Sequence, residues 1–314
     1  MSMLRRRMRV AIIGCGVIGR SWAVVFARAG AEVRLYDQNG DAAQRAPAVI
    51  AETLRGQGMK AAEVRAIEAA LLPVDSLAEA LGGAQYAQES IAETVAAKRA
   101  IFEQMDAVAP RECILASSCS SIPPAEFLGG LAGEWRSLIA HPFNPPHLIP
   151  LVELVPAPGT AEKVVARARR LLAGFGQHPV LLHKPVEGFI GNRLQAAVVS
   201  EIMHLIGEGV ASPADIDACL RLGLGLRWAM MGPLETMDLN ADGGIADYIG
   251  KFGKDYQALS RKLGIAEPWR EEAVAAAIES RRAALPIAAL RKRMGWRDRN
   301  LLRLRQLLEA PARR

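Results

Sequence analysis

Residues 141–155 read HPFNPPHLIPLVELV and contain a histidine and a carboxylate that could act together as a general base. Because the unperturbed pKa of histidine lies near neutral pH, an imidazole can remove the proton of a hydroxyl group. A carboxylate bonded to the ring fixes its tautomer and stabilises the imidazolium that forms. Glu153 follows His141 by 12 residues, and the prolines between them favour a stiff return loop. We therefore expect two short extended segments that bring both side chains together.

The other histidines are expected to have structural or surface roles. His147 is six residues from Glu153, inside or near the turn, and would face it less easily. His178 and His183 flank an apolar segment, and His204 lies in a helical pattern with apolar neighbours. His141 is therefore the preferred base.

A glycine-rich turn near the N-terminus has the spacing that binds the pyrophosphate of a dinucleotide. Residues 9–20 read RVAIIGCGVIGR, so three glycines follow an apolar strand and open a helix. The first glycine allows a tight turn, the second lets the backbone approach the pyrophosphate, and the third lets helix and strand pack closely. The free N–H groups of the helix N-terminus then face the phosphates. The expected cofactor-binding residues of this turn are Gly14, Gly16, Val17, Ile18 and Gly19.

An acidic residue at the end of the second expected strand completes this pattern. Asp37 ends the segment EVRLYD, 18 residues after Gly19. A carboxylate there accepts hydrogen bonds from ribose hydroxyls and repels a 2′-phosphate, which favours NAD over NADP as the cofactor. With NAD as the hydride acceptor and His141 as the base, the residues indicate oxidation of a secondary alcohol to a ketone.

Two further polar segments are expected where doubly wound sheets bind ligands, at strand ends or at the domain junction. One is ILASSCSSIPP, a strand that runs into a serine-rich turn, and the other is EGFIGNRLQ, which contains Asn192. We expect both to lie near His141.

The alternation of apolar runs and helical patterns predicts an α/β fold: a doubly wound, mostly parallel sheet of the Rossmann type. This domain is expected over residues 1–186, and an all-α substrate and dimerisation domain over residues 187–314. In the second domain, Ser212 is expected to cap a helix with Asp215 reaching back. The expected strands cover residues 10–13, 32–36, 113–116, 137–140, 151–155 and 179–183; the expected helices cover 41–54, 94–108, 160–175, 188–207, 242–263, 268–285 and 298–308.

Composition excludes several classes of protein. The 314 residues are 51% hydrophobic and 23% charged, as in a globular chain with a sizeable core. The net charge of +6 fits an anionic substrate or cofactor, and we find no nucleic-acid-binding motif. No apolar run is long enough for a membrane span. The 4 cysteines form no CxxC pair and no metal-spaced cluster, so we expect no metal site and a cytoplasmic location.

Longer motifs extend this interpretation to a family. HPFNPPHLIPLVELVP, ASSCSS and EGFIGNRL resemble the 3-hydroxyacyl-CoA dehydrogenase family, in which an NAD-binding Rossmann domain precedes a helical domain. Within the family the chain is most similar to the lambda-crystallin, or L-gulonate 3-dehydrogenase, branch. That likeness runs essentially end to end and is carried by GVIGRSWAVVFARAG, NPPHLIPLVELVP, GLGLRWAMMGPLETMDLNADG and WRDRNLLRL.

The resemblance implies roles for individual residues. It implies that His141 is the catalytic base with Glu153 as its orienting carboxylate, and that Ser120 and Asn192 face the 3-oxygen of the substrate. It also implies positions on the cofactor side for Glu93 and Lys98 in ESIAETVAAK. Cys119 departs from the threonine or asparagine of many members but leaves Ser120 intact.

The substrate stays open between several candidates. The segment LRGQGMKAAEV is compact and holds only Lys60, whereas the acyl-CoA branch has a longer, lysine-bearing clasp there. An L-gulonate-like L-3-hydroxy acid is therefore preferred, and Arg227 could meet its carboxylate or act instead as a structural arginine. A short-chain 3-hydroxyacyl-CoA such as 3-hydroxybutyryl-CoA is the second candidate. L-carnitine is the third, because RWAMMGP resembles carnitine dehydrogenases; an aromatic cage beside Trp228 would support it.

A protein of another class would be a non-catalytic, NAD-binding structural protein like a crystallin. The presence of all four expected catalytic residues argues against a non-catalytic protein, because a site without activity has no need of all of them. These residues are His141, Glu153, Ser120 and Asn192. The expected partners are a small-molecule substrate and a second copy of the chain in a homodimer, without nucleic acid or membrane.

Overall fold

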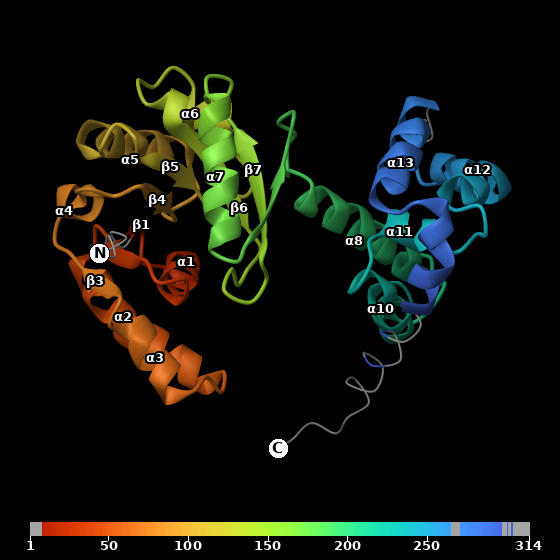
Figure 1. Ribbon diagram of the computed structural model, residues 1–314, viewed down its shortest axis with the longest axis horizontal. Coiled ribbons are helices and arrows are strands. Elements are labelled where there is room, and N and C mark those ends of the chain that lie inside the picture. Colours follow the sequence, from red (N-terminus) through yellow and green to blue (C-terminus); the bar gives the residue numbers. More distant parts are fainter. Residues whose placement is uncertain (1–7, 265–270, 297–299, 301–302, 304–314) are drawn as a thin grey trace. The chain divides into compact units, whose positions relative to one another are not determined.

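The computed structural model describes residues 8–264, 271–296, 300 and 303 (Figure 1). The chain divides into two compact units, Met1–Gln195 and Ala196–Arg314. The division falls inside the helix α8 (Gly191–Gly207), whose first turn therefore belongs to the first unit. Each unit is considered by itself.

The first unit is built on one eight-stranded sheet with the order β3-β2-β1-β4-β5-β6-β7-β8. Neighbouring strands are parallel except for the antiparallel pair β6 and β7. The strand order reverses between β1 and β4, and this is the switch point where doubly wound sheets bind nucleotides. The predicted fold class is confirmed. The strands are β1 (Arg9–Ile13), β2 (Glu32–Tyr36), β3 (Leu71–Pro73), β4 (Tyr86–Glu89), β5 (Ile114–Ser117), β6 (Ser137–Pro142), β7 (Leu151–Pro156) and β8 (His178–Leu181).

Helices cover both faces of this sheet. Successive side chains of β1 point to opposite faces, so they pack into two separate cores. Val10 and Ile12 pack into a cluster with α1, α2, α3 and α7, whereas Ala11 and Ile13 pack into a second cluster with α4, α5 and α6. The flanking elements are α1 (Val17–Arg28), α2 (Gly40–Gly56), α3 (Ala61–Glu68), α4 (Leu77–Leu81), α5 (Val95–Val108), α6 (Pro124–Leu128), η1 (Glu134–Arg136) and α7 (Glu162–Gly174).

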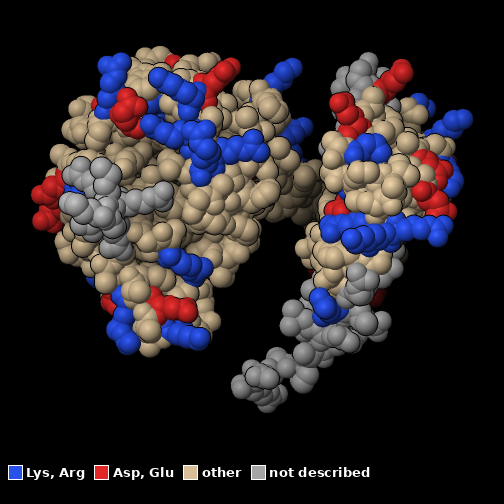
Figure 2. Space-filling view, in the orientation of Figure 1, with Lys and Arg blue, Asp and Glu red and all other residues tan. Residues whose placement is uncertain are grey.

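Basic side chains gather over α7 on the face of the first unit drawn in Figure 2. The same helix buries Val164, Ala168 and Leu172 in the core. Its charges therefore form the solvated side of an amphipathic helix.

The six predicted strands are confirmed with small shifts at their ends, but β3 and β4 were not predicted. β3 has only three residues and ends in proline. All four residues of β4 are buried, yet Gln88 and Glu89 are polar, so the segment does not read as an apolar run. Because polar side chains are uncommon in a fully buried strand, β4 is a candidate for a functional role.

The second unit is helical in its described residues, as predicted. Ser212 caps α9, because its hydroxyl accepts the backbone N–H of Asp215. The predicted helix 298–308 lies almost entirely outside the described residues, as does the start of the one predicted over 268–285. No helix in the described ranges is long and apolar enough to cross a membrane. The elements are α9 (Pro213–Ala218), η2 (Cys219–Leu224), α10 (Gly225–Trp228), α11 (Pro233–Asp238), α12 (Ile245–Lys262), α13 (Glu271–Ala284) and η3 (Ile287–Ala289).

Candidate active site

His141 and Glu153 lie directly opposite each other in the antiparallel pair β6 and β7. The Nδ1 atom of the imidazole is 2.8 Å from Oε2 of the carboxylate, and both side chains are buried. The return loop thus brings the two together, as the proline-rich spacing predicted. Because a carboxylate only accepts, the ring proton lies on Nδ1.

The second carboxylate oxygen of Glu153 holds the start of α8. Oε1 accepts the backbone N–H groups of Ile190 at 2.8 Å and Gly191 at 3.0 Å. Burial raises the pKa of Glu153, but the bond from His141 and those from Gly191 and Ile190 outweigh it and hold the pKa below its usual value. The carboxylate is therefore charged at neutral pH and pulls both the imidazole and the helix N-terminus toward itself.

Aromatic rings enclose the imidazole of His141. Its centroid lies 5.7 Å from that of Phe143 and 5.5 Å from that of Phe189. A side chain at Gly191 would meet the ring of Phe143, since an added Cβ would lie 2.0 Å from its Cζ. With Nδ1 engaged by Glu153, the Nε2 atom has no hydrogen-bond partner among the described residues and is left to accept a proton.

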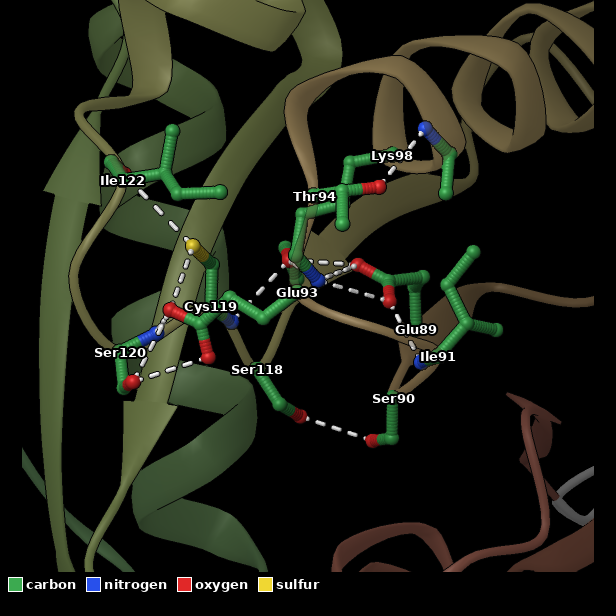
Figure 3. Close-up of polar contacts among 12 residues, drawn as sticks. Glu89, Ser90, Ile91, Glu93, Thr94, Lys98, Ser118, Cys119, Ser120 and Ile122 are labelled. Carbon is green, nitrogen blue, oxygen red and sulfur yellow. Dashed lines mark hydrogen bonds and ion pairs between the residues drawn. The ribbon is translucent and has the colours of Figure 1, made fainter.

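Several hydrogen bonds from the serine-rich turn after β5 converge on one carboxylate, that of Glu93 (Figure 3). Glu93 accepts the backbone N–H of Ser120 at 2.9 Å and of Ser121 at 2.8 Å, together with both hydroxyls. Burial of Glu93 raises its pKa, but these bonds outweigh it and lower the pKa to about 2. Glu93 thus stays charged across the physiological range and clamps the turn.

Asn192 connects the serine turn to the histidine pair. Its Nδ2 atom donates to the backbone oxygen of Ser120 at 3.0 Å. It follows Gly191, whose N–H is held by Glu153, so one series of contacts joins β6, β7, the start of α8 and the turn after β5. The structure therefore brings together all four residues predicted to be catalytic.

Lys98 is buried and is not exposed on the surface of the protein. Its Nζ atom is 3.0 Å from both carboxylate oxygens of Glu89, and both residues are almost fully buried. Glu89 also accepts the N–H of Ile91 and the hydroxyl of Ser117, and Ser117 in turn accepts the N–H of Cys119. This buried pair therefore anchors both the turn after β4 and the turn after β5. Glu89 and Ser117 were missed in the sequence, although a charged residue in a buried segment is the signal that identified Glu153.

The glycine turn fits the pyrophosphate of a dinucleotide. Gly14 has a φ of 97°, and an added Cβ on Gly19 would lie 1.8 Å from the Gly14 oxygen, so the fold itself requires both glycines. An added Cβ on Gly16 would meet nothing within 4 Å, so this glycine faces open space. The N–H groups of Val17 and Ile18 have no acceptor among the described residues, and they can receive phosphate oxygens.

Asp37 lies beside this turn, at the end of β2. One carboxylate oxygen accepts the N–H of Cys15 at 2.7 Å and the other that of Asn39 at 2.9 Å. Each oxygen keeps lone-pair capacity for a ribose hydroxyl. The predicted spacing of glycines and acid thus brings Asp37 into contact with the glycine turn.

His147 takes no part in this network of contacts. His147 bonds to the hydroxyl of Ser21 at 2.6 Å and to Gln57 at 3.1 Å, and it lines a cavity of about 180 Å³ with residues of α1 and α2. Burial lowers the pKa of His147, with the charge of Arg28 as a second cause. Arg227 lies half-buried in α10 of the second unit.

The fold and the paired imidazole and carboxylate define an NAD-dependent oxidoreductase that acts on a CH–OH group. Comparison with known proteins makes the class specific. Residues 9–185 match the model of the 3-hydroxyacyl-CoA dehydrogenase NAD-binding domain, and residues 188–276 match that of the C-terminal domain. The chain belongs to the 3-hydroxyacyl-CoA dehydrogenase family.

Individual relatives cover most of the chain. It is 39% identical to a lambda-crystallin homolog of Bos taurus, over 95% of each chain. It is 37% identical to an L-carnitine dehydrogenase of Streptomyces griseus, over 94% of this chain and 88% of the relative. A crystal structure of 3-hydroxybutyryl-CoA dehydrogenase from Escherichia coli is 32% identical, with a TM-score of 0.65 over 79% of this chain. The match spans only 53% of the length of that structure's chain. The predicted family and NAD cofactor are confirmed.

Proposed function

We propose that the protein oxidises the 3-hydroxyl of a small L-3-hydroxy acid, of the L-gulonate type, to the 3-keto acid, with His141 as the general base. The observation that carries the proposal is the placement of His141 opposite Glu153, with Nδ1 engaged and Nε2 left free. The compact α2 and α3 and the likeness to lambda-crystallin homologs favour a free acid over a CoA ester.

The mechanism follows from the hydrogen bonds that each group can still make. Bound NAD supplies the acceptor of the hydride. His141 takes the hydroxyl proton on Nε2, and the charge of Glu153 stabilises the imidazolium that results. Asn192 uses one N–H on the Ser120 oxygen and keeps a second for the substrate oxygen. The Ser120 hydroxyl has one proton, which it donates to Glu93 in this structure and would donate to the same substrate oxygen when substrate is bound.

The proposed cofactor contacts divide between two groups of residues. The turn formed by Gly14, Gly16, Val17, Ile18 and Gly19 would receive the pyrophosphate, while Asp37 would bind the adenosine ribose. Glu93 and Lys98 would act from the cofactor side by holding the two neighbouring turns in place.

The substrate alternatives make distinct predictions in one parallel assay. NADH formation is followed with NAD and each of L-gulonate, L-carnitine, L-3-hydroxybutyrate and 3-hydroxybutyryl-CoA. We expect the highest kcat/KM with L-gulonate, with Arg227 as the candidate anchor for its carboxylate. Preference for the CoA ester would refute the free-acid assignment, and preference for L-carnitine would favour a trimethylammonium site near Trp228.

The same assay separates enzyme from structural protein. Turnover of none of the four compounds by a chain that binds NAD would contradict catalysis and favour a crystallin-like role. The formed contacts among His141, Glu153, Ser120 and Asn192 support the enzyme.

A homodimer is the proposed assembly, and α8 supports it. This 17-residue helix buries none of its residues within the chain, and Val199 and Met203 are 46% and 61% exposed. Exposed apolar side chains repeated along one helix are typical of a surface that pairs with another protein. A second copy of the chain is the partner proposed here.

A further inference from the structure

A series of buried polar groups runs through the middle of the sheet to the switch point between β1 and β4. The hydroxyl of Tyr86 donates to Oε1 of Gln88 at 2.7 Å, and Nε2 of Gln88 donates to the hydroxyl of Ser118 at 2.8 Å. Trp22 also reaches the Ser118 hydroxyl, at 3.2 Å, and Ser118 lies 2.8 Å from the hydroxyl of Ser90 (Figure 3). The direction of each bond can be deduced.

The orientation of the Gln88 amide is fixed by a neighbour that can only accept. The backbone oxygen of Ala140 lies 3.3 Å from the amide nitrogen of Gln88. Exchange of the amide oxygen and nitrogen would set two oxygens against each other there. The nitrogen must therefore face Ala140 and Ser118, and it donates to both.

This orientation determines what Ser118 can do. A hydroxyl has two lone pairs and one proton. The N–H groups of Gln88 and Trp22 occupy both lone pairs of Ser118, so its proton is directed to the Ser90 oxygen. Ser90 accepts in this bond, and its own proton has no acceptor among the described residues.

Ser90 lies where a dinucleotide must pass. It follows the last residue of β4, and its backbone N–H bonds to Ile13 at the end of β1. A Cβ added to Gly14 would lie 2.7 Å from the backbone oxygen of Ser90, so the backbone of Ser90 packs against the glycine turn. Asp37 directly follows β2, on the opposite side of β1. With Asp37 on the adenosine ribose, the nicotinamide half of NAD would lie toward Ser90.

We propose that Ser90 is a cofactor-binding residue whose hydroxyl donates a hydrogen bond to an oxygen of the nicotinamide-ribose half of NAD. The buried chain from Tyr86 through Ser118 sets this polarity, because it leaves Ser90 only the donor role. The inference rests on the proposed placement of NAD on the glycine turn and adds a contact that the glycine motif does not contain.

The test compares two ligands by calorimetry on the full chain. NAD contains the nicotinamide ribose, whereas ADP contains only the adenosine half and the pyrophosphate. For Ser90→Ala we expect the Kd of NAD to rise about fivefold, which corresponds to about 1 kcal/mol for one neutral hydrogen bond. The Kd of ADP should stay unchanged. The Tm of the free protein should fall less than in Ser118→Ala, because only the Ser118 proton loses its acceptor.

Two control variants separate this role from others. Asp37→Ala should weaken NAD and ADP alike, which tests the placement of the adenosine half. Ser118→Ala should lower the Tm by leaving buried N–H groups unpaired, yet weaken NAD less than Ser90→Ala does. If Ser118→Ala does not fold, Ser90→Thr, which keeps the hydroxyl, should restore the NAD affinity that Ser90→Ala loses.

The outcomes that overturn the inference are distinct from failure of the cofactor site. Unchanged NAD affinity in Ser90→Ala, or an equal loss for NAD and ADP, would overturn the Ser90 contact alone. A fall in the Tm of free Ser90→Ala that accounts for the weaker binding would assign a structural role instead. Absence of NAD binding by the unmodified chain would overturn the proposed cofactor site as well.

Discussion

Glu153 uses its two oxygens for different purposes, and this division can be tested by one substitution. Glu153→Gln keeps the shape but turns one of the two acceptors into an N–H donor. If the amide nitrogen faces His141, it donates to Nδ1 and moves the ring proton to Nε2, so the base is lost. We expect kcat to fall roughly a hundredfold to ten-thousandfold, with the Kd of NAD unchanged. An equal loss of NAD affinity would contradict the assigned role.

Gly16 and Gly19 provide a matched pair in the same turn. An alanine at position 19 would place its Cβ 1.8 Å from a backbone oxygen, so Gly19→Ala should lower the free energy of unfolding measured in urea. An alanine at position 16 meets no atom within 4 Å, so Gly16→Ala should leave stability unchanged and weaken NAD binding at least tenfold. Retained NAD affinity in Gly16→Ala would contradict the placement of the pyrophosphate.

At the scale of elements, the ends of β4 and β5 are held by the buried pair of Lys98 and Glu89. Lys98→Met would leave the Glu89 carboxylate buried without its counter-ion. We expect a loss of about 3–5 kcal/mol in the free energy of unfolding, measured by urea denaturation. The double variant Lys98→Met with Glu89→Gln should recover much of this loss, because it removes the unpaired charge. A single variant as stable as the unmodified chain would contradict the account of these turns.

The same elements explain how much could be predicted from the sequence. The strands around His141 and Glu153 and the glycine turn were predictable, because apolar runs and fixed spacings mark them. β4 was not, because Gln88 and Glu89 interrupt any apolar pattern, and the partners that complete their hydrogen bonds include residues as distant in the sequence as Ala140 and Ser117. The clamp of Glu93 on the serine turn joins residues 27 positions apart, which spacing alone does not reveal.

At the scale of the whole molecule, the proposed homodimer predicts that a substitution in α8 can change the mass at which the protein sediments. We expect the unmodified protein to sediment at twice the chain mass of 33.8 kDa. Met203→Glu should shift it toward the single-chain mass, because a charge would enter an apolar contact. Val108→Glu, at a residue 43% exposed at the end of α5, is the matched control and should leave the mass unchanged. A single-chain mass for the unmodified protein would contradict the dimer.

The groups proposed for proton transfer and cofactor binding all belong to the first unit, whereas Arg227 belongs to the second. The proposed roles in the reaction thus involve residues of the first unit, and the test of Arg227 as a substrate anchor concerns a residue of the second.

The most direct test of the central claim is the single-turnover rate of NADH formation from NAD and L-gulonate in His141→Gln and His147→Gln. Should another substrate prove better in the parallel assay, that substrate takes the place of L-gulonate. We predict that His141→Gln slows hydride transfer by roughly a hundredfold to ten-thousandfold while NAD still binds. His147→Gln should keep most of the rate, because His147 bonds to α1 and α2 instead. Near-normal hydride transfer in His141→Gln, or an equal loss in His147→Gln, would contradict His141 as the base.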